Sequence, residues 1–171
     1  NIIWVAPTGS VTAPFIPYRI GVRAIAPQFG KHRYLTKGEA SRFLDADWQI
    51  REATEYAGRT FKRLMYYTCD RPEEFLPEVN AALTAFENRL IAEQEIVADT
   101  ANVLFGQGRR DLALDYLTRY SRVSGAEGLD LGNALLASIE ARTEAIYGLR
   151  EPTTSEMSAA GGERINCLPK N

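Results

Sequence analysis

The first 24 residues show the pattern of β-strands. Residues 2–6 form a short apolar run, a Pro-Thr-Gly-Ser turn follows, and residues 11–24 form a second extended run. Pro14 and Pro17 lack backbone donors, so the early part of the second run belongs at the edge of a sheet or outside it. We therefore expect strands over residues 2–6 and 11–24.

The spacing of apolar residues changes to a helical period near Thr36. Thr36 is followed three residues later by Glu39, which is the pattern of a capping box. Because a proline inside a helix costs about 3 kcal/mol, we expect the longest helix to begin at Pro77. The predicted helices are 47–69, 77–105, 111–123 and 129–147, with a short turn over 72–76 and a stop at Ser124-Gly125. The expected buried positions of the longest helix are Val79, Leu83, Phe86, Leu90, Ile96 and Val97.

Three segments follow from these patterns. Residues 1–35 form a β segment with two strands and a basic loop, residues 36–151 form a helical portion, and residues 152–171 form an extended tail. The tail is rich in small and polar residues, which cannot offset the entropy cost of their own ordering. We expect the tail to contact a second polypeptide.

Two strands alone make only a marginal sheet. One interpretation is that the helices of this chain cover the apolar residues of the strands. The other, which we favour, is that the strands complete a sheet whose remaining strands lie on a companion polypeptide. The chain opens on Asn1 rather than Met, so we also expect that a preceding segment of the same precursor has been removed.

Composition excludes several classes of function. The net charge of −2 does not suggest nucleic-acid binding, and no apolar run is long enough to span a membrane. The charge is uneven, however, because residues 1–37 contain no acidic residue. This segment is either a basic sheet surface or a surface that faces an acidic partner or an anionic ligand. Its five cationic residues are Arg19, Arg23, Lys31, Arg33 and Lys37.

No complete catalytic or metal-binding set is visible in the sequence. His32 is the only histidine, and its neighbours Lys31 and Arg33 would lower its basicity, so we interpret it as a solvated loop residue. Cys69 and Cys167 are 98 positions apart, which is no metal or redox spacing. They could pair if the compartment is oxidising and the tail folds back, but we expect Cys69 to be a buried free thiol. We therefore predict no catalytic residue, no metal site and no cofactor in this chain. Asn88 and Gln94 on the longest predicted helix are weaker candidates for a site.

Several short motifs resemble bacterial cysteine dipeptidases of the N-terminal-nucleophile (Ntn) hydrolase class. Ile-Trp-Val-Ala-Pro at residues 3–7 is followed by Pro-Phe-Ile-Pro-Tyr-Arg-Ile-Gly-Val at residues 14–22, and helix-entry motifs follow at residues 43–48 and 61–65. The resemblance extends from residue 2 to about residue 94. It implies an α+β fold in which the strands complete an αββα sandwich and a mostly helical C-terminal portion follows.

The resemblance also implies a function. The chain would be the C-terminal subunit of an amide or peptide hydrolase in which the nucleophile is the freed N-terminal residue of the mature enzyme. Asn1 is not a usable nucleophile, so the nucleophile would lie on a companion chain, the N-terminal part of the same precursor. Tyr18 and Arg19 would bind substrate, because an arginine on a strand at a cleft can hold a peptide carboxylate.

Two alternatives stay open. The chain is either a non-catalytic helical subunit or interaction module of an enzyme complex, or a helical bundle that binds a small ligand as a stable monomer. A homo-oligomer is possible as well. Our hypothesis for its location is the periplasm or the outside of the cell.

Overall fold

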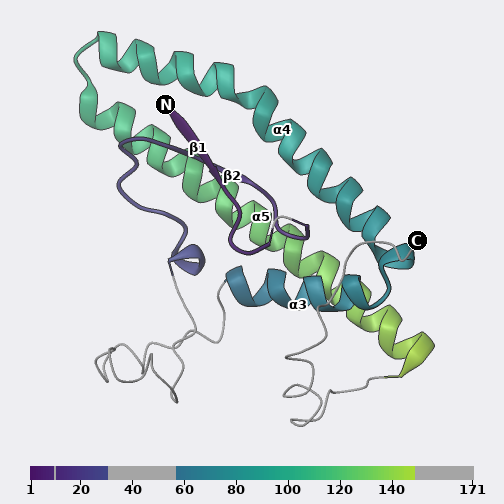
Figure 1. The fold of residues 1–171 in the computed structure, drawn as a ribbon. Helices are drawn as coiled ribbons and strands as arrows, with labels where there is room; N and C mark the ends of the chain where they lie inside the picture. The colour runs from purple at the N-terminus through teal and green to yellow at the C-terminus, as the bar shows by residue number, and fades with distance from the viewer. Residues whose placement is uncertain (10, 31–56, 149–171) are drawn as a thin grey trace, which may run out of the picture.

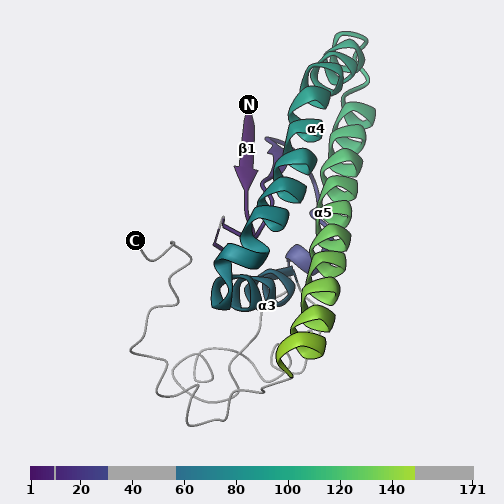
Figure 2. The ribbon, with the colours of Figure 1, turned by 90° about the vertical axis from the view of Figure 1, so that its right-hand side faces the viewer.

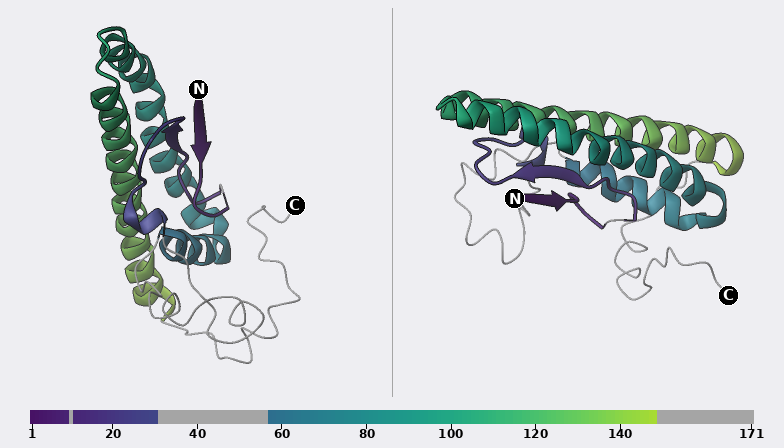
Figure 3. Two further views of the ribbon diagram at one scale, coloured as in Figure 1. Left: turned by 90° about the vertical axis from the view of Figure 1, so that its left-hand side faces the viewer. Right: turned by 90° about the horizontal axis from the view of Figure 1, so that it is seen from above.

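The computed structural model describes residues 1–9, 11–30 and 57–148. Two long antiparallel helices, α4 and α5, form a layer, and a β-hairpin and the shorter helix α3 lie together on one side of this layer (Figures 1 and 3). The elements are β1 (Ile2–Val5), β2 (Ile16–Arg19), the 3-10 helix η1 (Pro27–Phe29), α3 (Ala57–Asp70), α4 (Pro72–Gly106) and α5 (Arg110–Tyr147).

The interface between α4 and α5 is made by apolar residues at helical spacing. The tight connection between these helices contains Gly108, whose φ of +73° is unfavourable for other residues. Figure 2 shows the two helices running alongside each other from their connection, with the C-terminal end of α5 extending beyond the start of α4. The buried residues of α4 are Phe75, Val79, Leu83, Phe86, Leu90, Val97 and Ala101. Ile96, which we expected in this core, is 69% exposed.

Small residues of α5 allow the other elements to approach closely. A Cβ added at Gly132 would lie 2.4 Å from Phe61 Cε1 of α3, and one added at Gly128 would lie 2.9 Å from Ile16 Cδ1 of β2. Gly125 packs against Ala26 and Phe29 in the same way. These contacts hold α3, β2 and η1 against a single face of α5.

The β-hairpin is antiparallel, and its two outer edges differ. Ile2 pairs with Arg19 and Val5 with Ile16. The outer edge of β2 faces α5, where Pro17 has no N–H group and its carbonyl accepts a hydrogen bond from Ser121 Oγ at 3.0 Å. Helix α5 therefore covers the outer edge of β2, and β1 is the strand farther from the helices.

The expected αββα sandwich is wrong for the described part of the chain. Residues 1–9, 11–30 and 57–148 contain one two-stranded sheet, and helices pack on it from one side only. The physical reason lies in the second extended run, which is a strand only over Ile16–Arg19 rather than over 11–24. Prolines at its start and Gly21, with φ of +99°, at its end limit its length.

The helices also differ from the prediction in their bounds. Helix α4 begins at Pro72, not Pro77, and continues through Pro77. Pro72 suits the first position of a helix, where its missing N–H has no helical partner. Helix α5 is continuous through Ser124 and Gly125, where we predicted a stop. The prediction of at least three helices between residues 40 and 148 is confirmed. The predicted helix start at Thr36 and the tail from residue 152 lie outside the described residues.

Cys69, at the end of α3, is buried as expected. It is disulfide-bonded, however, and the expectation of a free thiol is therefore wrong. The second cysteine of the sequence, Cys167, lies outside the described residues.

Candidate functional site

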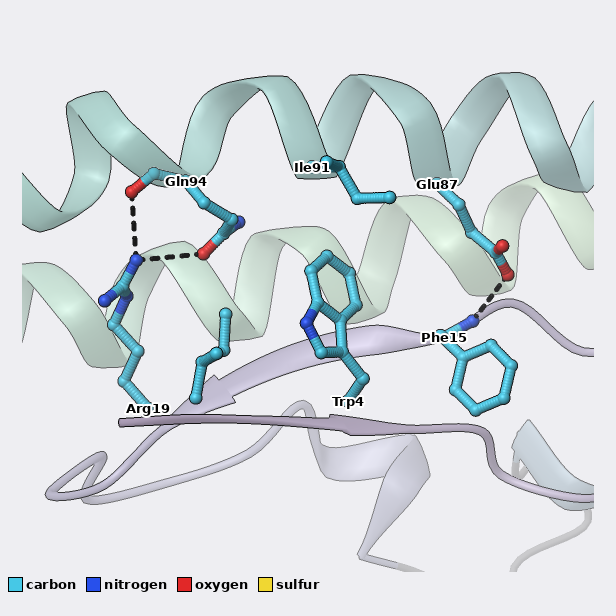
Figure 4. A pocket seen from close by; sticks show the side chains of 7 residues that line it. Trp4, Phe15, Arg19, Glu87, Ile91 and Gln94 are labelled. Carbon is cyan, nitrogen blue, oxygen red and sulfur yellow. Dashed lines mark hydrogen bonds between the residues drawn. The ribbon is translucent and has the colours of Figure 1, made fainter.

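A cleft of about 560 Å³ lies between the β-hairpin and α4. Its floor is the hairpin face that carries Trp4 and Arg19, and its roof is the stretch of α4 from Glu87 to Gln94 (Figure 4). Seven residues line it: Ile2, Trp4, Phe15, Arg19, Glu87, Ile91 and Gln94. Four of these are apolar, so the cleft presents a hydrophobic middle with a polar group towards each end.

Arg19 occupies one end of the cleft, and Gln94 fixes its position. Arg19 Nη2 donates hydrogen bonds of 3.0 Å to both the backbone oxygen and Oε1 of Gln94 (Figure 4). The other terminal nitrogen, Nη1, forms no hydrogen bond with the residues that the structure describes. Nε is buried and likewise without a partner among them. The guanidinium is therefore held in place while part of its donor capacity stays unused.

The Gln94 side chain is itself held by two further hydrogen bonds. Its Nε2 donates to the Leu90 carbonyl at 2.7 Å and to the Tyr120 hydroxyl at 3.0 Å. Tyr120 in turn donates to Glu93 Oε2 at 3.0 Å. Burial and the neighbouring carboxylate of Glu93 raise the pKa of Tyr120 to about 12. This network joins β2, α4 and α5 and fixes the orientation of the amide that binds Arg19.

Glu87 occupies the other end of the cleft. Its Oε1 accepts a hydrogen bond of 2.9 Å from the backbone N–H of Phe15 (Figure 4). Glu87 and Gln94 are seven residues apart on α4, which corresponds to about 10 Å along a helix. The two polar groups thus lie at opposite ends of the apolar middle formed by Trp4 and Ile91.

The structure separates the two residues that we expected to bind substrate. Arg19 lies in the cleft, but Tyr18 projects from the other face of β2 and is absent from the cleft lining. Tyr18 packs near Ile16 and Phe86, and burial raises the pKa of its hydroxyl. The close-up in Figure 4 accordingly contains Arg19 but not Tyr18.

The basic N-terminal segment finds acidic partners within the chain itself. Arg23 forms ion pairs with Asp111 and Asp115 of α5, the second at 3.1 Å. For Arg23, the expected acidic partners therefore lie within the same chain. His32 and the remaining cations of the segment, Lys31, Arg33 and Lys37, lie outside the described residues.

The described residues contain neither a candidate metal site nor a helix that could cross a membrane. No group of three or more His, Cys, Asp or Glu side chains within 1–9, 11–30 and 57–148 could hold a metal ion. Among the helices of the same part of the chain, none is long and apolar enough to cross a membrane.

Comparisons of the chain with protein-family models, with curated proteins and with solved structures found no match. The resemblance to Ntn dipeptidases therefore stays a hypothesis that depends on the short motifs quoted above.

Sequence reasoning did not connect the residues that form the cleft. Gln94 was a weak candidate by its position on a helix, and nothing marked Glu87 or Trp4 as its neighbours. Arg19 and Gln94 are 75 residues apart, so no local pattern reports their contact. One residue of the cleft could be identified from the sequence: Arg19 was a candidate because it is an arginine on a predicted strand.

Proposed function

We propose that this chain is the C-terminal, non-nucleophile-bearing part of an amide or peptide hydrolase, and that its cleft binds the carboxylate end of the substrate. The observation that supports this most directly is Arg19, whose guanidinium is held by Gln94 at the end of an apolar cleft. The hydrolase class comes from the resemblance at residues 3–7 and 14–22. The nucleophile is supplied by a companion polypeptide, the N-terminal part of the same precursor.

The cleft suits a carboxylate with an apolar body. A carboxylate at Arg19 would accept a charge-assisted hydrogen bond from Nη1, worth about 1.5–3 kcal/mol. Arg19 needs little reorganisation because its hydrogen bonds to Gln94 already restrict its rotamers. An adjacent hydrophobic side chain of the ligand would contact Trp4 and Ile91, which line the middle of the cleft.

Binding is tested with a matched pair of ligands on the full chain. N-acetyl-leucyl-leucine and its C-terminal amide differ only in the charge that Arg19 would recognise. A Trp48→Phe background leaves Trp4 as the sole tryptophan, so its fluorescence reports occupation of the cleft. We expect the acid to bind about tenfold or more tightly than the amide, which corresponds to at least 1.4 kcal/mol.

Two variants decide whether Arg19 is responsible for this preference. Arg19→Gln keeps a donor for Gln94 but removes the charge, so we expect the acid and the amide to bind equally. Arg122→Gln is the control, because Arg122 is exposed on α5 and does not line the cleft. Equal binding of acid and amide by the unaltered chain would refute the carboxylate site.

Hydrolysis is tested on the protein purified from its natural source with the chains that accompany it. We expect cleavage of acylated dipeptides by the assembly and a rise in KM, not a fall in kcat, in the Arg19→Gln variant. An assembly that binds the acid but cleaves no amide would refute the hydrolase assignment. It would favour the non-catalytic interaction module instead, which the exposed apolar face of β1 also fits.

A further inference from the structure

The cleft has a second charged end, which the carboxylate site at Arg19 does not use. Glu87 Oε1 accepts the hydrogen bond of the Phe15 N–H at 2.9 Å, whereas Oε2 accepts none from the residues that the structure describes. Figure 4 shows the Glu87 carboxylate at one end of the cleft and the Arg19 guanidinium at the other. Glu87 is therefore held in position and keeps one oxygen for a cationic donor.

The middle of the cleft favours an apolar chain over a peptide group. Between the two charged ends lie the side chains of Ile2, Trp4 and Ile91, none of which contains a hydrogen-bond acceptor. A ligand N–H placed there would lose its water without gaining a side-chain partner, which is unfavourable. Methylene groups in the same place would instead gain apolar contacts.

The distance between the charged ends matches the length of a lysine. Glu87 is about 10 Å along α4 from Gln94, the residue that holds Arg19. Phe15, which binds Glu87, is about 13 Å from Arg19 along an extended backbone. An extended lysine places its ammonium group about 7 Å from its carboxylate. With a charge-assisted hydrogen bond of about 2.8 Å at each end, it spans about 13 Å.

We infer that the cleft recognises peptides whose C-terminal residue is lysine. The C-terminal carboxylate binds Arg19, the methylene groups contact Trp4 and Ile91, and the ammonium group binds Glu87 Oε2. This inference rests on the proposed function, because the carboxylate site at Arg19 belongs to it. The α-ammonium group of a free dipeptide fits Glu87 less well, since the peptide N–H would then lie among side chains without an acceptor.

Three ligands test the inference on the full chain with the Trp48→Phe change, in which the fluorescence of Trp4 reports binding. N-acetyl-leucyl-lysine and N-acetyl-leucyl-norleucine have the same four-carbon side chain, and only the lysine carries an ammonium group. We expect the lysine compound to bind about fivefold or more tightly, and added salt to reduce this preference. N-acetyl-leucyl-2,4-diaminobutyrate has the same charges but is two methylene groups shorter, so we expect it to show no such preference over norleucine.

Two variants decide whether Glu87 recognises the ammonium group. Glu87→Gln keeps an acceptor for the Phe15 N–H but removes the charge, so we expect the lysine and norleucine compounds to bind equally. Its preference for N-acetyl-leucyl-norleucine over the corresponding amide should persist, because Arg19 is unchanged. Glu95→Gln is the control, because Glu95 is exposed on α4 and does not line the cleft, and this variant should keep the preference for lysine.

Three results would overturn the inference. The first is equal binding of the lysine and norleucine compounds by the chain with Glu87 intact; a preference for the acid over the amide would then still support the proposed function. The second is a preference for lysine that persists in Glu87→Gln. The third is binding of leucyl-norleucine, with its free α-ammonium group, as tight as that of N-acetyl-leucyl-lysine, which would identify a free dipeptide as the ligand. Equal binding of N-acetyl-leucyl-norleucine and its amide would refute the carboxylate site itself.

Discussion

Gly132→Ala tests the close packing of α3 on α5. The added methyl group would lie 2.4 Å from Cε1 and 2.8 Å from Cζ of Phe61, well inside the 3.5–4.0 Å of an ordinary carbon–carbon contact. Phe61 is fully buried, so its ring cannot move into solvent. Either the ring must leave its rotamer or α3 must move away from α5.

The expected cost is the difference between two effects. Overpacking a core costs about 1–3 kcal/mol, and the severity of this contact places it near the upper end. Replacing an interior helical glycine by alanine returns about 1 kcal/mol through helix propensity. We therefore expect a net loss of about 1–2 kcal/mol in the free energy of unfolding. For a chain of this size that is a fall in melting temperature of about 2–8 °C.

Thermal unfolding followed by circular dichroism measures this change, with Gly106→Ala as the matched control. Gly106 ends α4, and a Cβ added there would meet no other part of the described structure within 4 Å, so the control should melt at or slightly above the temperature of the unaltered chain. Phe61→Leu combined with Gly132→Ala should cost less than the sum of the two single changes, because the smaller side chain relieves the contact. A Gly132→Ala variant that melts at or above the unaltered chain would refute the packing described for these helices.

Two further predictions concern the polar contacts of α5. Ser121→Ala removes the buried hydrogen bond to the Pro17 carbonyl and should lower the free energy of unfolding in urea by about 1–3 kcal/mol, whereas an unchanged midpoint would contradict a role for this bond. The pKa of Tyr120 is raised from 10.0 to about 12 in the folded chain, so the stability that its neutral hydroxyl provides is complete below pH 10 and is lost as the pH rises towards 12. Unfolding midpoints between pH 9 and 12 should therefore fall less steeply in Tyr120→Phe than in the unaltered chain, and parallel curves would show that burial and the contact with Glu93 do not have this effect.

The elements that depend on local patterns could be predicted from the sequence. The Pro-Thr-Gly-Ser turn and the apolar run before it gave the hairpin, and the spacing of Val79, Leu83 and Phe86 gave the buried face of α4. Ile96 was misassigned, since periodicity alone does not reveal where the partner of a long helix lies. The prediction of an αββα sandwich came from the family resemblance, and no pattern of apolar and polar residues supported it.

The remaining features depend on contacts between distant residues. Ser124-Gly125 resembles a helix stop, but Ser124 Oγ donates to the Tyr120 carbonyl one turn earlier, and Gly125 leaves room for Ala26. Both residues are therefore compatible with a continuous α5 once η1 packs there. The cleft likewise depends on Gln94 meeting Arg19 across 75 residues, which no window of the sequence contains.

Because the two edges of the hairpin differ, a β-sheet that includes the hairpin can be extended on one side only. A strand with two free edges can join neighbours on both sides, and repetition of that step builds fibres. Here Pro17 and Ser121 close one side permanently, so any sheet that recruits this hairpin ends at it. A strand that paired with β1 would therefore form a sheet that ends at β2. Repeated addition of strands through both edges of this hairpin is blocked at β2.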